Sequence, residues 1–241
     1  IHIGCENGDI AIKLIQYLSQ FVPHFIALSS SSPYSQSHDT LFQSSRLTSI
    51  SSFPLSGIIP DVYNWAEFKK YFETMQNTGI VASMKDFYWD IRPQPNYGTI
   101  EVRVCDTPIT IHKACIIATY IYLLSNYFLR NQELLKDSKI NRYTYSYNKF
   151  QAARYGFDGV IVRDVRGSNK ISIADDIQST LILLKDFAFT TNTHSYYEEI
   201  IDIVKNKDSN SNQIRDILKK KKDFSSVVEW LCESWKSKTT S

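Results

Sequence analysis

The sequence lacks several features that would assign a protein to a class at once. Its 241 residues carry a net charge of only +2 at pH 7, so no overall basic field indicates a nucleic-acid partner. The most hydrophobic stretch, Ala114 to Leu124, falls short of the roughly 20 apolar residues that a membrane span needs. No signal peptide is recognisable. We therefore expect a globular protein that binds neither nucleic acid nor a membrane.

Cysteine is scarce and is not arranged for metal or redox chemistry. The chain has four cysteines, at positions 5, 105, 115 and 232, with no CxxC pair and no metal-ligand spacing. Such spacing favours thiols in the core of a protein from a reducing compartment, because disulfide and metal frameworks place cysteines at characteristic intervals. We therefore expect a cytoplasmic protein.

Two neighbouring segments have the alternating pattern of β-strands. In the first, Phe87, Trp89 and Ile91 share one face, and Tyr88, Asp90 and Arg92 share the other. In the second, the apolar face holds Ile100, Val102 and Val104, and the opposite face holds Thr99, Glu101, Arg103 and Cys105. The turn PQPNYG between them predicts an antiparallel hairpin. Each strand thus places an acid and an arginine on one face, which is either a wet outer face or the floor of a charged site.

Helical periodicity accounts for much of the remaining chain. It predicts a helix capped by Asp9 and interrupted at Pro23, and a second helix capped by Asn64 and ended by Gly79, with Glu67 at the capping-box position. The serine run ALSSSSPYSQ predicts a loop. A buried helix is predicted over 109–130, a short strand over 159–162, and helices over 172–189, 195–207 and 211–241. The fold class that we expect is α+β.

Several stretches taken together resemble one known family. IHIG at the start resembles the second half of an HxHxG strand motif, and ALSSSSPYSQSHDTLFQSSR resembles the segment LALSANSP…DTGxASYR. WDIRPQPNYGTIEVRVCDT resembles WDVRPSPxxGTxEVRVCDT nearly residue for residue, and NKFQAARYGFDG is similar to NKWxAARYGLDA. These motifs belong to the glutamate–cysteine ligase type 2 family, the carboxylate–amine ligases related to glutamine synthetase.

The resemblance implies a fold and an extent. The family fold is a curved antiparallel sheet with helices on its outer face and the active site on its concave face. The chain would be the C-terminal portion of a single catalytic domain, with a strand-rich active-site segment over 1–108 and a mostly helical part over 109–241. Because IHIGC starts inside an apolar alternation without an initiator Met, we expect a fragment whose upstream strands are missing. Alone, it is expected to be inactive and to expose an open sheet edge.

The resemblance also implies a reaction. The γ-carboxylate of glutamate attacks ATP to give an acyl phosphate, and an amine, with cysteine the first candidate, displaces phosphate. ATP and Mg²⁺ or Mn²⁺ would be required, the partners would be glutamate and cysteine or another amine, and a homodimer is possible in this family. An alternative interpretation is a relative that keeps the fold as a binding or structural module without turnover.

The expected site residues follow from matching positions. Glu101 is the expected metal ligand, with His2 as a second, because divalent cations that bridge phosphates prefer hard oxygen ligands. Arg103 and Arg92 are the expected catalytic residues, since guanidinium groups clamp carboxylate and phosphoryl oxygens in pairs. Arg103 could instead serve only to pair with Asp90 or Glu101.

Three further residues are expected to bind substrate. Arg46 ends the stretch that resembles ASYR and would hold a substrate carboxylate. Asn148 and Arg154, in the stretch that resembles the later family motif, would contact nucleotide or glutamate, although a role on a helix surface is an equal alternative. The chain departs from the family where QSSR replaces ASYR, which removes the aromatic residue beside Arg46.

Overall fold

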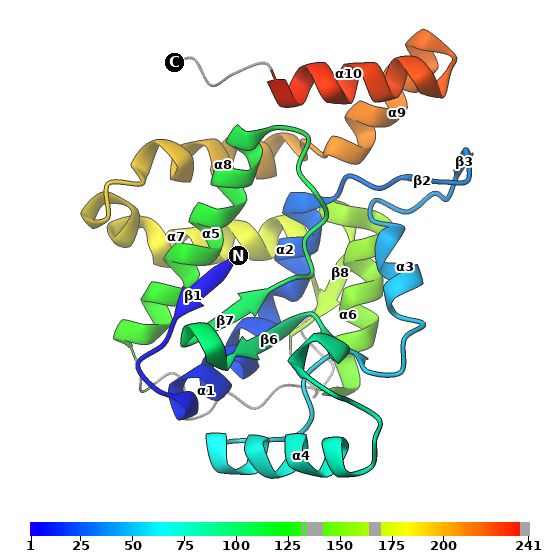
Figure 1. Ribbon diagram of the computed structural model, residues 1–241. Helices are drawn as coiled ribbons and strands as arrows, with labels where there is room; N and C mark the ends of the chain where they lie inside the picture. Colours follow the sequence, from blue (N-terminus) through cyan, green and yellow to red (C-terminus); the bar gives the residue numbers. More distant parts are fainter. Residues whose placement is uncertain (132, 134–141, 164–169, 237–241) are drawn as a thin grey trace.

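A three-stranded antiparallel sheet lies at the centre of the computed structural model, which describes residues 1–131, 133, 142–163 and 170–236. Its order is β1 (His2–Gly4), β7 (Thr99–Val102) and β6 (Ile91–Gln94). Figure 1 shows this sheet in front of α1 (Gly8–Leu18) and α2 (Val22–Ser29), so that one face is covered by helices and the other is turned to the viewer.

The other elements surround the sheet. The further helices described are α3 (Arg46–Ile50), α4 (Trp65–Asn77), α5 (Ile111–Arg130), α6 (Arg142–Tyr155), α7 (Ile173–Thr190), α8 (His194–Asn206), α9 (Asn210–Lys221) and α10 (Phe224–Lys236). Three strand pairs complete the description: β2 (Tyr34–Ser35) with β3 (His38–Asp39), β4 (Ser56–Gly57) with β5 (Tyr88–Trp89), and β8 (Val160–Val162) with β9 (Lys170–Ser172). The mixture of helices and small sheets agrees with the expected α+β class.

The sheet register places the polar residues in one row. His2 of β1 and Arg92 of β6 both lie directly opposite Glu101 of the middle strand β7. The next row, Ile3, Ile100 and Pro93, points to the helices, and Ile100 is fully buried. The turn Pro95–Tyr97 and Gly98, whose φ is +62°, closes the β6–β7 hairpin. The predicted hairpin and the alternation of 99–104 are therefore confirmed.

The predicted helices are found with small shifts except at the C-terminal end, and one predicted cap is wrong. The single helix predicted over 211–241 is two helices, α9 and α10, because the left-handed residue Lys222, whose φ is +62°, ends α9; positions 237–241 lie outside the described residues. Asn64 caps α4 as expected, accepting a hydrogen bond from the Glu67 amide at 2.9 Å. The cap of α1 is Asn7 and not Asp9. Asp9 instead accepts the first amide of α4, from Trp65, at 2.7 Å, and so joins two helices that are far apart in sequence. Before residue 108, α1 to α4 accompany β1 to β7, and after it the described chain is helical except for β8 and β9.

The predicted alternating strand over 87–92 is in fact two strands. β5 pairs in parallel with β4, β6 pairs with β7, and the chain changes partner at Asp90. The Asp90 carboxylate is buried and does not lie on the polar face with Arg92. The expectation that Asp90 and Arg92 share a charged face is therefore wrong, because Asp90 has partners on α6.

Asp90 is held by side chains of α6 and by hydrogen bonds of its own backbone. Lys149 Nζ lies 2.7 and 2.6 Å from its two carboxylate oxygens, and the Tyr145 hydroxyl donates to it at 2.6 Å. The Asp90 backbone amide donates to Gly57 at 2.7 Å, and its carbonyl accepts the Arg103 amide at 2.9 Å. All three side chains are at least 90% buried. The Asp90 cluster, meaning Asp90, Lys149 and Tyr145, thus ties α6 to the strand that carries Arg103.

A second buried polar cluster lies among the helices behind the sheet. His24 of α2 is fully buried, with Nε2 at 2.5 Å from Asp176 of α7 and Nδ1 at 2.8 Å from the hydroxyl of Tyr120 on α5. Arg163 also pairs with Asp176. Burial lowers the pKa of His24 despite the opposing effect of Asp176. We take His24 as neutral, because Arg163 already supplies the cation for Asp176.

The four cysteines differ in their exposure to solvent. Cys5 and Cys105 are partly covered, and burial raises the pKa of each thiol to about 11. Cys115 and Cys232 are exposed, so the expectation of core thiols is wrong for these two.

Over the described ranges, no helix has both the length and the apolarity to cross a bilayer.

Removing Lys149 should destabilise the fold strongly. Lys149→Met leaves the buried Asp90 carboxylate without its cation, and we expect the free energy of unfolding in urea to fall by about 3–5 kcal/mol. The control is Lys219→Met, because Lys219 and its partner Asp216 are both exposed; it should change stability by less than about 1 kcal/mol. Equal effects of the two substitutions would contradict the role of the Asp90 cluster.

Acid should weaken the fold through His24. An ordinary histidine pKa is 6.5, and burial depresses that of His24, so below pH 6.5 the unfolded chain binds a proton that the folded chain does not yet accept. The free energy of unfolding should therefore fall from pH 6.5 towards 5, by at most about 1.4 kcal/mol per pH unit from this residue.

Denaturation at pH 7, 6 and 5 measures this slope. His24→Gln should flatten it, whereas His38→Gln, at an exposed position, should leave it unchanged. An unaltered slope in His24→Gln would contradict the assignment. Asp176 does not contribute in this range, because burial acts to raise its pKa but the bonds and charges of His24 and Arg163 prevail and lower it to about 2.

Candidate functional site

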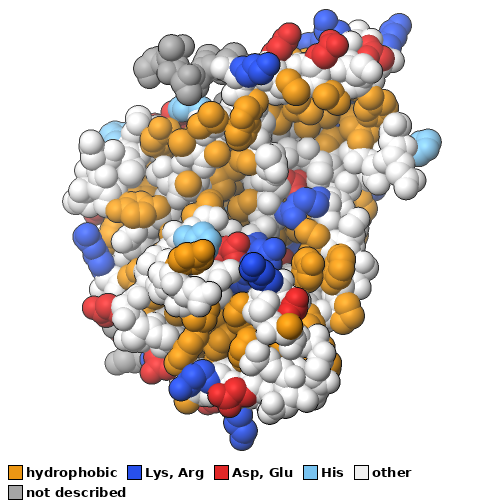
Figure 2. All heavy atoms as spheres, in the orientation of Figure 1, with side chains coloured by type: hydrophobic (Ala, Val, Ile, Leu, Met, Phe, Trp, Pro, Cys, Tyr) orange, Lys and Arg blue, Asp and Glu red, His pale blue; other side chains and the backbone are white. Residues whose placement is uncertain are grey.

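The polar face of the central sheet carries a cluster of charged side chains. Figure 2, drawn from the same side as Figure 1, shows acidic, basic and histidine side chains gathered over the three strands. By register these include His2, Glu101 and Arg92. Arg103 follows at the end of β7, where its amide bonds to Asp90. We call Arg92, Glu101 and Arg103 the strand cluster.

Glu101 is the centre of the strand cluster. Its Oε2 accepts hydrogen bonds of 2.8 Å from Arg92 Nε and of 2.8 Å from Gln94 Nε2. Its Oε1 lies 3.6 Å from Arg103 Nε. Burial alone would raise the pKa of Glu101, but Gln94 and the two arginines together lower it. Glu101 is therefore a carboxylate at neutral pH, with one oxygen fully engaged and the other free of any close hydrogen bond.

Each arginine is fixed by backbone oxygens as well as by Glu101. Arg92 is almost fully buried and donates from Nη1 to the carbonyls of Met84 at 2.9 Å and Phe87 at 3.0 Å. Arg103 donates to the same Phe87 carbonyl at 3.1 Å, and its side chain keeps 31% of its surface exposed. Burial, together with the charge of Arg92, lowers the pKa of Arg103. The guanidinium remains a cation at neutral pH, so Arg103 offers free donors to an anion.

Arg46 lies beside this cluster, at the start of α3. Its Nε donates to Asp106 at 2.8 Å, and its Nη2 donates to the carbonyls of Val104 and Cys105 at 2.8 and 2.9 Å. It lines one small hollow together with Arg103 and Tyr88. Arg46 is thus next to Arg103, although its pairing with Asp106 leaves only part of the guanidinium for a ligand.

His2 and Glu101 can supply part of a cation site. They are direct partners across β1 and β7 and share the polar face. His2 is exposed, and its Nδ1 lies 2.9 Å from Thr99 Oγ1, which leaves Nε2 available. Within the described ranges, no three His, Cys, Asp or Glu residues are grouped so that they could hold a metal ion. A cation held by this pair would therefore need further ligands, such as phosphate oxygens or water.

Asn148 and Arg154 are bound away from the strand cluster. The Asn148 amide donates to the Val162 carbonyl at 2.9 Å and accepts from the Val162 amide at 2.8 Å, so it fastens α6 to β8. Arg154 donates to the Leu41 carbonyl and lies 5.1 Å from the centre of the Phe42 ring. The structure therefore brings Glu101, Arg92, Arg103, Arg46 and His2 to one face but gives Asn148 and Arg154 other partners.

Two residues of the site were not singled out by the sequence. Gln94 donates a hydrogen bond to the same oxygen of Glu101 as Arg92 does. Asp106 accepts hydrogen bonds from Arg46, from the Ser31 amide at 3.1 Å and from the Ser32 hydroxyl at 2.7 Å. Both lie within the stretch WDIRPQPNYGTIEVRVCDT. The polar character of an aspartate that follows a buried strand, near a serine-rich loop, is the signal that could have identified Asp106.

Comparison with known proteins places the chain in a family. The family model described as Glutamate-cysteine ligase family 2 (GCS2) matches residues 1–230. A protein of Janthinobacterium sp. (strain Marseille) named "Putative glutamate--cysteine ligase 2" is 46% identical over 235 residues, and one of Herminiimonas arsenicoxydans with the same name is 47% identical over 235 residues. These alignments cover 98% of this chain but only 63% of the length of each relative. The chain therefore belongs to the glutamate–cysteine ligase family 2.

Proposed function

We propose that the protein catalyses the ATP-dependent ligation of the γ-carboxylate of glutamate to an amine, with cysteine as the first acceptor to test. The observation that carries the proposal is the strand cluster, in which Glu101 is held on the middle strand between Arg92 and Arg103. Family membership and the names of the relatives support a ligase of this class. The proposed fold relation to glutamine synthetase rests on the sequence resemblance.

The proposed reaction has two steps. An oxygen of the γ-carboxylate attacks the γ-phosphorus of ATP, and ADP leaves with the electrons of the broken bond. The amine nitrogen then attacks the acyl carbon of the γ-glutamyl phosphate, inorganic phosphate leaves, and the amine gives up a proton to solvent. The enzyme itself forms no covalent bond, so its task is to position the reactants and to stabilise charge.

The roles of the arginines follow from their exposure and partners. Arg103 is fixed at one end by Glu101 and the Phe87 carbonyl and is partly exposed at the other, so it is placed to bind the transferring phosphoryl group. Arg92 is nearly buried, and its Nε and Nη1 donate to Glu101 and to two backbone carbonyls, so it orients Glu101 instead of meeting the substrate. Arg46, already held by Asp106, would bind a carboxylate of glutamate through its remaining donors.

A divalent cation is part of the proposal. Glu101 Oε1 and His2 Nε2 would hold it, and when bound it would neutralise charge on the ATP phosphates. The two arginines near Glu101 keep the carboxylate ionised, which a hard cation requires of its ligand. Because four free thiols and ATP chemistry fit a reducing compartment, we propose a cytoplasmic setting.

Hydroxylamine offers a test that is independent of the amine. This small nucleophile traps an activated γ-glutamyl group as a hydroxamate. Incubation of the protein, expressed from its complete open reading frame, with glutamate, ATP, Mg²⁺ and hydroxylamine should give γ-glutamyl hydroxamate and ADP in equal amounts. ADP formation that does not depend on glutamate would contradict the ligase reaction, and the absence of both ADP and hydroxamate would favour the non-catalytic alternative.

Arg103→Lys should not act as a conservative substitution. Lysine keeps the charge but loses the planar pair of donors that fits a phosphoryl or carboxylate group. We expect kcat for hydroxamate formation to fall by at least ~10²-fold, comparable to the loss of one preorganised donor. The control is Arg215→Lys, because Arg215 of α9 pairs with Asp39 of β3 and not with a residue of the strand cluster. A near wild-type kcat for Arg103→Lys would restrict Arg103 to a structural pair.

Glu101→Gln should separate cation binding from folding. The amide oxygen can still accept from Arg92, so the chain should still fold, at a lower stability because Arg92 loses its acid, but a neutral amide is a poorer ligand for a hard cation. We expect most turnover to be lost and the remaining activity to need a much higher Mg²⁺ concentration. The control is Glu198→Gln, at an exposed helix position. Activity that is unchanged at limiting Mg²⁺ would remove Glu101 from the site.

A further inference from the structure

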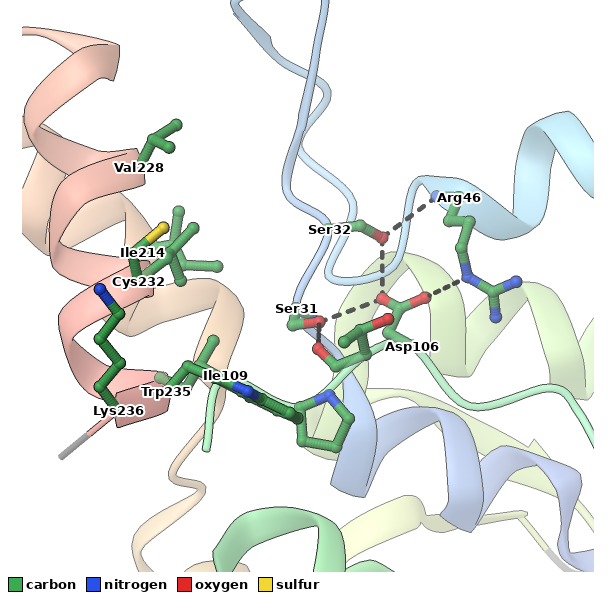
Figure 3. A pocket seen from close by; sticks show the side chains of 13 residues that line it. Ser31, Ser32, Arg46, Asp106, Ile109, Ile214, Val228, Cys232, Trp235 and Lys236 are labelled. Carbon is green, nitrogen blue, oxygen red and sulfur yellow. Dashed lines mark hydrogen bonds and ion pairs between the residues drawn. The ribbon is translucent and has the colours of Figure 1, made fainter. Parts of the chain in front are cut away.

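A cavity of about 490 Å³ lies between α10 and the body of the protein. This is within the range of roughly 300–1,000 Å³ that small-molecule sites occupy. Figure 3 shows its two walls: side chains of α9 and α10 on one side, and the loop of Ser31 and Ser32 with Arg46 and Asp106 on the other. The floor is formed by Thr107, Pro108 and Ile109.

The wall formed by α9 and α10 is apolar except for Lys236 at the end of α10. Its apolar residues are Ile214, Val228, Leu231, Cys232 and Trp235. Val228 is 58% exposed and Trp235 is 46% exposed, so two large apolar side chains on this wall are left uncovered. Helix α10 itself is anchored, because Val227 is buried and Phe224 contacts the ring of Tyr34 edge to face at 5.2 Å. The uncovered apolar surface is therefore held in place.

The opposite wall is polar, but its groups already satisfy one another. Asp106 accepts from Arg46, from the Ser31 amide and from the Ser32 hydroxyl, while the Ser31 hydroxyl donates to the Thr107 carbonyl at 2.6 Å. A ligand that entered this cavity would find few free donors or acceptors there. The part of a ligand that fits is therefore an apolar group with little polarity of its own.

The cavity adjoins the candidate site through Arg46. Arg46 lines both the cavity and the small hollow that contains Arg103. The segment from Arg103 to Asp106 links them, and three residues span at most about 11 Å. A ligand whose reactive end lies at the strand cluster can therefore place an aromatic or long aliphatic group under α10.

We propose that the cavity under α10 receives the apolar group of the acceptor amine, so that the acceptors include amines with aromatic or long aliphatic side chains. This inference rests on the proposed ligase function and specifies its second substrate. Trp235 and Val228 are then specificity-determining residues, since they meet the apolar group and not the reacting atoms. The ligation step is unchanged: the amine nitrogen still displaces phosphate from the γ-glutamyl phosphate.

The test compares acceptors in the protein expressed from its complete open reading frame. We expect kcat/KM for phenylalanine to exceed that for alanine by at least tenfold, because each added methylene in an apolar pocket is worth roughly 10- to 200-fold. Trp235→Ser should lower kcat/KM for phenylalanine about tenfold and leave hydroxylamine, which does not reach the cavity, within twofold of wild type. Val228→Ser serves as a second variant.

The control and the contrary outcomes are well separated. Phe189→Ser, at an exposed position on α7 that is 53% accessible, should change neither acceptor. Hydroxamate formation together with no preference for phenylalanine over alanine would overturn this inference and leave the proposed function intact. So would a Trp235→Ser variant that loses all acceptors equally while light scattering shows a dimer becoming a monomer, since the apolar wall would then be an interface between copies. A protein that forms no hydroxamate would fail the proposed function itself.

Discussion

One carboxylate between two guanidinium groups organises the polar face of this protein. Glu101 sits on the middle strand, and it has a bonded arginine on the neighbouring strand and another arginine two residues further along its own. Arg92 is nearly buried, and a buried arginine without an acid would be costly. The same carboxylate therefore stabilises Arg92, orients Arg103 towards the open side, and stays ionised for a cation. The same three charged side chains therefore stabilise the sheet and take part in the proposed chemistry.

The position of that strand depends on a helix that is remote in sequence. Asp90 lies where the chain leaves β5 for β6, and its backbone carbonyl accepts the amide of Arg103. Lys149 and Tyr145 of α6 hold its side chain. The stretch NKFQAARYG thus contributes to the site indirectly. Lys149 holds Asp90, whose backbone carbonyl accepts the amide of Arg103. Asn148 joins α6 to β8.

The sequence predicted local secondary structure better than it predicted which side chains contact one another. Alternation alone placed Ile100, Val102 and Glu101 on the correct faces, because a strand has a period of two whatever surrounds it. The same rule failed at Asp90, since the break there is caused by β4 and by Lys149, 59 residues away. The family resemblance singled out both Arg46 and Arg103, which line one hollow in the structure. The motif could not show that the Asn148 side chain would form hydrogen bonds with the Val162 backbone, because side-chain partners depend on packing.

The most direct measurement of the central claim follows an oxygen atom. If the strand cluster positions the γ-carboxylate of glutamate to attack ATP, then one of its oxygens must leave with phosphate. Glutamate labelled with oxygen-18 in the γ-carboxyl group should, in the presence of ATP, Mg²⁺ and an amine, yield inorganic phosphate that contains one labelled oxygen per ligation. Phosphate whose new oxygen comes only from water would show that no acyl phosphate forms, and would contradict the account.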